Sequence, residues 1–178
     1  MFDGFENFGL RISEIDGGSL RNAIPRESVA TFAVSKNKSG ELLEGLKQVV
    51  LEIKSEFKTV DANLSIEVNP IDIPNKGMDN KAQSQLLKAI YAAHNGVYRM
   101  SPDIEGLVET SNNIARIIVK DGVIKIGCLT RSSSESNKFD LANSLRSAFE
   151  LAGFNVELSG SYPGWPAHRW HFLFLVFR

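Results

Sequence analysis

Three histidines and one cysteine are the side chains of this chain best suited to metal binding or nucleophilic chemistry. His168 and His171 lie three residues apart, a spacing that would bring two imidazoles to one helix face, where they could bind a metal ion. However, no Asp, Glu or Cys follows His168, and the sequence contains no His-x-Asp, Glu-Glu or His-Glu-x-x-His motif. We therefore expect no metal site in this chain, and we interpret both residues as part of an anomalous tail. His94 is expected at a helix end, where a cation suits the helix dipole.

Cys128 could act as a nucleophile, or it could pack as a small apolar residue. Ile124, Ile126 and Cys128 alternate along a predicted strand and would share one of its faces, which favours packing. A single cysteine cannot form an internal disulfide, so the chain suits a reducing cytoplasm.

The composition and net charge of the chain limit the kinds of partner that it is expected to bind. The 178 residues are 43% hydrophobic, which fits one globular domain or two small half-units that share a core. A net charge of -1 without any basic stripe argues against a nucleic-acid partner. No basic, then apolar, segment resembles a signal peptide, and the apolar cluster at 170–177 is too short to cross a bilayer, so no membrane partner is expected.

Alternating apolar or β-branched residues predict the strands of the first half, at 8–15, 28–35 and 64–68. Asp16-Gly17-Gly18 is expected to end the first of them. Between the second and third strands, apolar residues at helical spacing predict a helix over 40–57 that is capped by Ser39.

A second helix is predicted over 79–94, with Asp79 as its cap and Asn95-Gly96 at its end, followed by a short strand at 97–100. The second half then repeats the order of the first. Its predicted elements are strands at 107–120 and 122–131 joined at Asp121-Gly122, a helix over 137–152 capped by Ser136 or Asn137 and ended at Gly153, and a strand at 154–158.

Two such halves predict an α+β fold. The expected sheet is largely antiparallel, has about seven strands and carries helices on one face, as two fused ferredoxin-like half-units. Helices 40–57 and 137–152 should share that face and be related by a pseudo-twofold axis. The predicted organisation is a domain over 1–165, with half-units at 8–74 and 104–162 and helix 79–94 between them, and a tail at 166–178 outside the sheet.

Four stretches resemble a known family. In chain order they are Asp16-Gly17-Gly18-Ser19-Leu20-Arg21-Asn22-Ala23-Ile24-Pro25-Arg26-Glu27, Gly106-Leu107-Val108-Glu109-Thr110-Ser111-Asn112-Asn113, Cys128-Leu129-Thr130-Arg131-Ser132 and Tyr162-Pro163-Gly164-Trp165. Their order and spacing resemble the cytosolic aminoacyl-histidine (Xaa-His) dipeptidases of the aminoacylase–carboxypeptidase–carnosinase family. The resemblance covers about residues 8–165 and ends after Trp165.

The resemblance implies that this chain is the lid of a metallodipeptidase. In that family a separate catalytic domain binds two zinc ions and carries the catalytic glutamate, so the chain alone is expected to have no zinc site and no activity. The implied partners are the missing catalytic domain and, in the whole enzyme, a dipeptide substrate. A homodimer is left open.

The resemblance also implies roles for three lid residues. Asn22, which precedes Ala-Ile-Pro, matches a lid asparagine that faces substrate. Arg131 matches an arginine that binds the substrate carboxylate, a task that suits its bidentate fork. Asn113 is a third substrate-binding candidate. Against these roles, Asn22 could serve only its turn, and Arg131 could be a solvated strand end.

Two other classes of function compete with the lid. One is a free-standing ferredoxin-like module that binds a protein or a small molecule, and the other is an intact but unusual hydrolase. The missing ligand motifs argue against the hydrolase. The joint presence of the Asn22 and Arg131 segments argues against the module.

Overall fold

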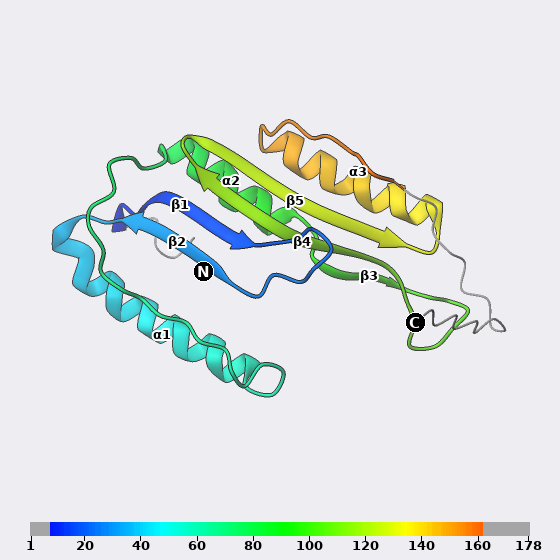
Figure 1. Cartoon of the computed structure of the whole chain (residues 1–178), viewed down its shortest axis with the longest axis horizontal. Helices are drawn as coiled ribbons and strands as arrows, with labels where there is room; N and C mark the ends of the chain where they lie inside the picture. The colour runs from blue at the N-terminus through cyan, green and yellow to red at the C-terminus, as the bar shows by residue number, and fades with distance from the viewer. Residues whose placement is uncertain (1–7, 162–178) are drawn as a thin grey trace, which may run out of the picture. The chain divides into compact units, whose positions relative to one another are not determined.

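The computed structural model describes residues 8–161 of the chain (Figure 1). Three α-helices and five strands form within this range. The strands are β1 (Arg11–Gly18), β2 (Ser28–Ala33), β3 (Gly96–Met100), β4 (Val108–Lys120) and β5 (Val123–Ser132), and the helices are α1 (Ser39–Phe57), α2 (Asn80–Ala92) and α3 (Glu135–Leu151), with a short 3-10 helix at Lys36–Lys38. The predicted α+β class is confirmed.

The strands form one hydrogen-bonded sheet in the order β2-β1-β4-β3, and β5 also pairs with β4. β1 pairs antiparallel with β2, and β3 pairs antiparallel with β4. Asp121 and Gly122 join β4 to β5, and both have positive φ angles, 52° and 79°. Two consecutive positive φ angles are the mark of a type I′ turn, so the predicted hairpin is confirmed.

The described residues divide into two compact units. The first unit comprises residues 8–17, 27–87 and 117–125, and the second comprises 18–26, 88–116 and 126–161. The predicted half-units, and the shared helix face with its pseudo-twofold axis, stay predictions. The predictions for residues 162–178, which include His168, His171 and the Tyr162 motif, concern residues outside the described range.

The first unit has an apolar core between β1 and α1. Leu10, Ile12, Leu42 and Leu46 are buried there, and Phe32 of β2 packs against them. The helical spacing in α1 therefore predicted Leu42 and Leu46 correctly as buried, whereas Leu43 and Phe57 of the same predicted stripe are exposed. The predicted cap was wrong: Ser39 lies inside α1, and its hydroxyl donates to the carbonyl of Lys36 at 2.8 Å.

A buried glutamine of α2 completes the backbone pairing at the start of β1. The side-chain oxygen of Gln83 accepts from the Ile12 N–H at 2.8 Å, and its amide nitrogen donates to the Leu10 carbonyl at 3.1 Å. Gln83 is only 7% exposed, and Ile12 is 1% exposed. One side chain therefore satisfies two backbone groups that water does not reach.

We expect Gln83→Ala to lower the free energy of unfolding by about 1–3 kcal/mol, because a buried N–H and a buried carbonyl each lose a partner. Gln83→Glu should be at least as harmful at neutral pH, since a carboxylate can accept from Ile12 but cannot donate to Leu10. Gln48→Ala on α1 is the control, because the Gln48 hydrogen bond to Glu52 is exposed. Urea titration monitored by circular dichroism measures all three. Equal midpoints for Gln83→Ala and the control would contradict this.

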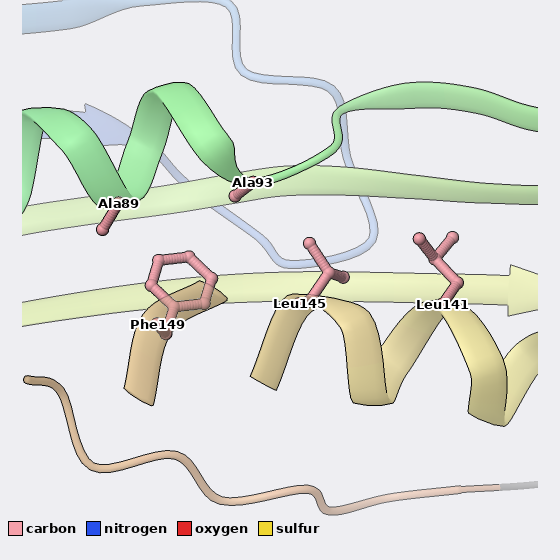
Figure 2. Close-up of a cluster of buried hydrophobic side chains, with 5 residues drawn as sticks. All are labelled: Ala89, Ala93, Leu141, Leu145 and Phe149. Carbon is pink, nitrogen blue, oxygen red and sulfur yellow. The ribbon is translucent and has the colours of Figure 1, made fainter. Parts of the chain in front are cut away.

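The second unit packs α3 against the end of α2. Leu141, Leu145 and Phe149 point from α3 toward the side from which Ala89 and Ala93 approach (Figure 2), and all five residues are buried. Ile114 of β4 and Ile126 and Cys128 of β5 pack against the same cluster. Cys128 thus packs with its strand neighbour Ile126, as its alternation predicted.

The helix ends in the second unit show which polar residues act as caps. Ser134 caps α3 by accepting from the Asn137 N–H, so the predicted cap at Ser136 or Asn137 was two or more residues late. Gly153 has the positive φ, 90°, that was expected after the helix. In the first unit, Asp79 accepts from the Ala82 N–H at 2.9 Å, which is the predicted cap of α2.

Two predicted strands are not formed, so the described sheet has five strands and not about seven. Segments 64–68 and 154–158 are irregular. In each, the first two apolar residues are half-buried with an exposed residue between them, whereas the third, Val68 or Leu158, is exposed. Phe154 and Val156 pack against the cluster of α3, and the Phe154 ring meets the Phe149 ring edge-on, at 6.2 Å between centroids. The alternation therefore reflects one-sided packing of an extended segment, which needs no ladder partner.

The bounds of β1 also differ from the prediction. The strand runs to Gly18, because Asp16 and Gly17 still pair with Val29 and Ser28 of β2. The chain turns only after Gly18, whose φ is +73°. No helix within residues 8–161 is both long and apolar enough to cross a membrane.

Candidate functional site

Two of the motifs singled out in the sequence lie side by side on β4 and β5, in the second unit. The hydroxyls of Thr110 and Ser132 are 2.8 Å apart, and the Thr130 hydroxyl donates to the Asn112 side chain at 3.0 Å. Each pair joins a residue of β4 to a residue of β5. The polar residues of the two motifs therefore hold one another across the strands.

Asn112 is the centre of this polar row. It is 3% exposed, and its amide nitrogen donates to the His94 carbonyl at 2.8 Å. Its side chain also hydrogen-bonds to Cys128. Asn112 thus joins β4, β5 and the segment after α2, and both its amide nitrogen and its amide oxygen are hydrogen-bonded within the protein.

Cys128 is half-buried by the same packing. Burial raises the pKa of the Cys128 thiol above its ordinary value of 9.0, and the hydrogen bond with Asn112 lowers that pKa in part. A thiol with a raised pKa is a poor nucleophile at neutral pH. The geometry therefore favours packing over catalysis for this residue.

We expect Cys128 in the folded chain to react with an aromatic disulfide reagent at pH 8 at least about tenfold more slowly than in urea-unfolded chain. The folded pKa is raised, so the stability contributed by the protonated thiol is fully present below the unfolded pKa. It is lost as the pH rises through the folded pKa. Stopped-flow labelling and urea midpoints between pH 7.5 and 10 test both statements, with Cys128→Ala as the variant that should lose this pH dependence. Equal labelling rates in folded and unfolded chain would refute the shielding.

A second polar group ties β3, β4 and α3 together. Glu109 accepts from the Asn137 amide at 2.6 Å and pairs with Arg99 at 3.3 Å. The Glu109 side chain is 10% exposed, whereas that of Arg99 is half exposed. The Glu109 carboxylate therefore has a structural role, because its partners lie within the protein.

His94 is also engaged within the protein. A ring nitrogen lies 3.1 Å from the Val97 carbonyl, and the ring stacks edge-on against Tyr98 at 5.3 Å between centroids. These contacts favour the structural role expected for His94. Across residues 8–161, no three His, Cys, Asp or Glu side chains gather closely enough to hold a metal ion.

Asn22 lies in the loop 19–27, between β1 and β2, and it is exposed. The Ala23 N–H donates to the Leu20 carbonyl at 3.0 Å, which closes a β-turn with Arg21 and Asn22 at its centre. The amide of Asn113 donates to the Ala23 carbonyl at 2.7 Å, across 90 positions of sequence. Asn113, one of the three predicted site residues, therefore contacts the residue that follows Asn22, another of the three.

The geometry of β4 and β5 places Arg131 on the same face of the sheet as Asn113. Neighbouring residues of a strand point to opposite faces of a sheet. Asn112 and Thr130 hydrogen-bond on one face, so Asn113 and Arg131, each the next residue along, belong to the other face. Arg131 is exposed on β5, and its side chain forms no hydrogen bond or ion pair within residues 8–161. An uncommitted guanidinium on the face that carries the Asn22 loop can bind a carboxylate.

Sequence reasoning missed the residues that hold the loop. Arg116 of β4 donates to the Gly18 carbonyl, and a Cβ on Gly18 would lie 1.9 Å from the Ala115 oxygen. The positive φ of Gly18 could be suspected from the Gly-Gly pair. The contacts with Arg116 and Asn113 are long-range, and no local pattern indicates them.

Known proteins resemble this chain over part of their length. No family model matches. The chain is nevertheless homologous to dipeptidases, which confirms the resemblance drawn from the motifs. Over 161 residues it is 36% identical to the cytosol non-specific dipeptidase of Escherichia coli (strain K12), a match that covers 90% of this chain and 33% of the relative.

A solved structure shows the same likeness in three dimensions. The crystal structure of the aminoacylhistidine dipeptidase from Vibrio alginolyticus matches with a TM-score of 0.87 and 34% identity, again over 90% of this chain and 33% of the other. The chain therefore spans about a third of the length of the dipeptidases that it matches, and its fold is that of one section of them.

Proposed function

We propose that this chain is the lid of a dipeptidase that hydrolyses aminoacyl-histidine dipeptides, and that the catalytic domain lies outside these 178 residues. The observation that carries the proposal is the match of 90% of the chain to only a third of two dipeptidases. The exposed Asn22, held on a loop beside β4, supports it. A cytoplasmic location is supported by the similarity to the cytosol non-specific dipeptidase of Escherichia coli.

The metal requirement follows from the same proposal. The described residues do not fit a zinc site, because no three ligand-type side chains gather among them. We therefore assign the two zinc ions expected for the whole enzyme to the catalytic domain. The lid contributes polar groups that bind and orient the substrate.

Within the lid, we assign Asn22 to the scissile carbonyl and Arg131 to the substrate carboxylate. An amide N–H beside the carbonyl oxygen can stabilise the charge that develops there in the transition state. A guanidinium can hold a carboxylate with two parallel hydrogen bonds. Asn113 completes the proposed site at the base of the Asn22 turn.

A chimera tests the proposal directly. In it, this chain replaces the matching third of the Escherichia coli dipeptidase, and hydrolysis of glycyl-histidine is measured with zinc present. We expect the chimera to be active and the same enzyme without that third to be inactive. A well-folded chimera that binds zinc but cleaves no dipeptide would overturn the lid assignment.

We expect the purified 178-residue chain, by itself, to cleave neither glycyl-histidine nor β-alanyl-histidine, and to bind far less than one equivalent of zinc, because a zinc site needs three or four gathered ligands. Product detection by chromatography and metal analysis after dialysis measure the two quantities. The active chimera is the positive control for the assay. Equimolar zinc together with dipeptide cleavage by the chain alone would refute the expectation.

A further inference from the structure

The loop that carries Asn22 is fixed at two points by one strand. Asn113 and Arg116, both on β4, donate hydrogen bonds to the carbonyls of Ala23 and Gly18 respectively. Gly18 ends β1 directly before the loop, and Ala23 closes the turn within the loop. The Asn22 backbone is therefore held on both sides by side chains of β4.

The approach of this loop to β4 is as close as a backbone allows. A Cβ on Gly18 would lie 1.9 Å from the Ala115 oxygen, so only glycine fits. Asn113 is half-buried at this contact, whereas Asn22 is exposed. An N–H of Asn113 is committed to the Ala23 carbonyl at 2.7 Å, and the Asn22 side chain is the one presented to solvent.

We infer that Asn113 is a positioning residue for Asn22: it fixes the turn so that the Asn22 amide is pre-oriented toward the substrate. The expected effect on turnover rests on the proposed lid function. The contact between Asn113 and Ala23 does not depend on it. Pre-orientation matters because a catalytic donor loses effect when its geometry is loose by about 1 Å. Asn113 then contributes to turnover through Asn22 and not through a substrate contact of its own.

The rate of tryptic cleavage in the 178-residue chain tests whether Asn113 holds the loop in place. The Arg21–Asn22 bond lies in the turn, and cleavage there requires the loop to open locally. We expect Asn113→Ala to speed this cleavage about tenfold, because the loop loses a hydrogen bond and a partly buried anchor. Asn113→Asp, which keeps the shape but not the N–H donor, should also speed it. Asn69→Ala, in the first unit, is the matched control and should cleave as the parent chain does.

The Lys58–Thr59 bond, after α1, serves as an internal reference. Local release of the loop raises the Arg21 rate relative to the Lys58 rate, whereas global unfolding raises both. If the rate ratio stays unchanged in both Asn113→Ala and Asn113→Asp, the positioning role is overturned. This assay needs no enzyme activity, so its result does not depend on whether the chain is the lid of a dipeptidase.

A double-mutant cycle in the chimera tests the catalytic consequence. Asn113→Ala should lower kcat about tenfold when Asn22 is present, and should have little further effect in the Asn22→Ala background. A substrate contact by Asn113 itself would instead cost the same factor in both backgrounds, which would overturn the inference. An inactive chimera with Asn22 and Asn113 both intact would refute the lid proposal, while the trypsin result would still decide the contact.

Discussion

Leu141→Ala is expected to lower the free energy of unfolding by about 3 kcal/mol, and by as much as about 5 kcal/mol if the site cannot collapse. Leu141 is 0% exposed and sits in the cluster that joins α3 to Ala89 and Ala93 of the second unit. Removing three carbons there forfeits the burial of the side chain and leaves a cavity. For a domain of ordinary stability, this is a large share of the total.

The same helix provides a matched control. Leu151 ends α3 and is 89% exposed, so Leu151→Ala makes the same chemical change in the same element without a cavity. We expect its effect to stay within about 0.5 kcal/mol. Urea unfolding of both variants, followed by circular dichroism at one pH, measures the difference. If the two variants unfold at the same urea concentration, the cluster in Figure 2 does not stabilise the second unit.

In the chimera, Asn22→Ala is expected to lower kcat about a hundredfold if its amide stabilises the developing oxyanion. Arg131→Ala should mainly raise KM for glycyl-histidine, because a carboxylate contact is made in the bound substrate as well as in the transition state. Steady-state kinetics over a range of substrate concentrations separates kcat from KM. Both residues are exposed, so neither substitution should disturb folding.

The control for this pair is a guanidinium elsewhere on the chain. Arg146 lies on α3 and is assigned no part in the site, so Arg146→Ala should leave both constants near those of the chimera. Arg131→Lys should recover only part of the lost binding, since an ammonium cannot form two parallel hydrogen bonds. Near-normal kinetics for Asn22→Ala and Arg131→Ala would leave both residues with structural roles only.

Local chemistry made several features of the fold predictable. Asp121-Gly122 specified its hairpin because both residues tolerate a positive φ, and Asp79 capped α2 because its carboxylate reaches a free N–H of the first turn. The cap of α3 was misplaced within a run of serines, 132–134 and 136. Each can cap, and only the extended backbone of Ser134 after β5 selects it.

The missed strands and the missed loop contacts share one cause. Alternation at 64–68 and 154–158 indicates that one side of the segment is covered, but it does not indicate whether a helix or a strand covers it. Likewise, Asn22 could be matched from its own motif, whereas the hydrogen bond from Asn113 to Ala23 joins residues 90 positions apart. Such pairings depend on the sheet that brings the residues together.

The polar pairs between β4 and β5 also discriminate against wrong folds. If the hairpin slipped by one residue, every side chain of one strand would turn to the opposite face. Thr110 and Asn112 would then lose Ser132 and Thr130, and their hydroxyl and amide groups would be desolvated without partners, at a cost of about 1–3 kcal/mol each. An all-apolar row would tolerate such a slip far better. The row of hydrogen bonds therefore favours the native register of the hairpin during folding. It raises the free energy of a misregistered hairpin by more than it lowers that of the native one.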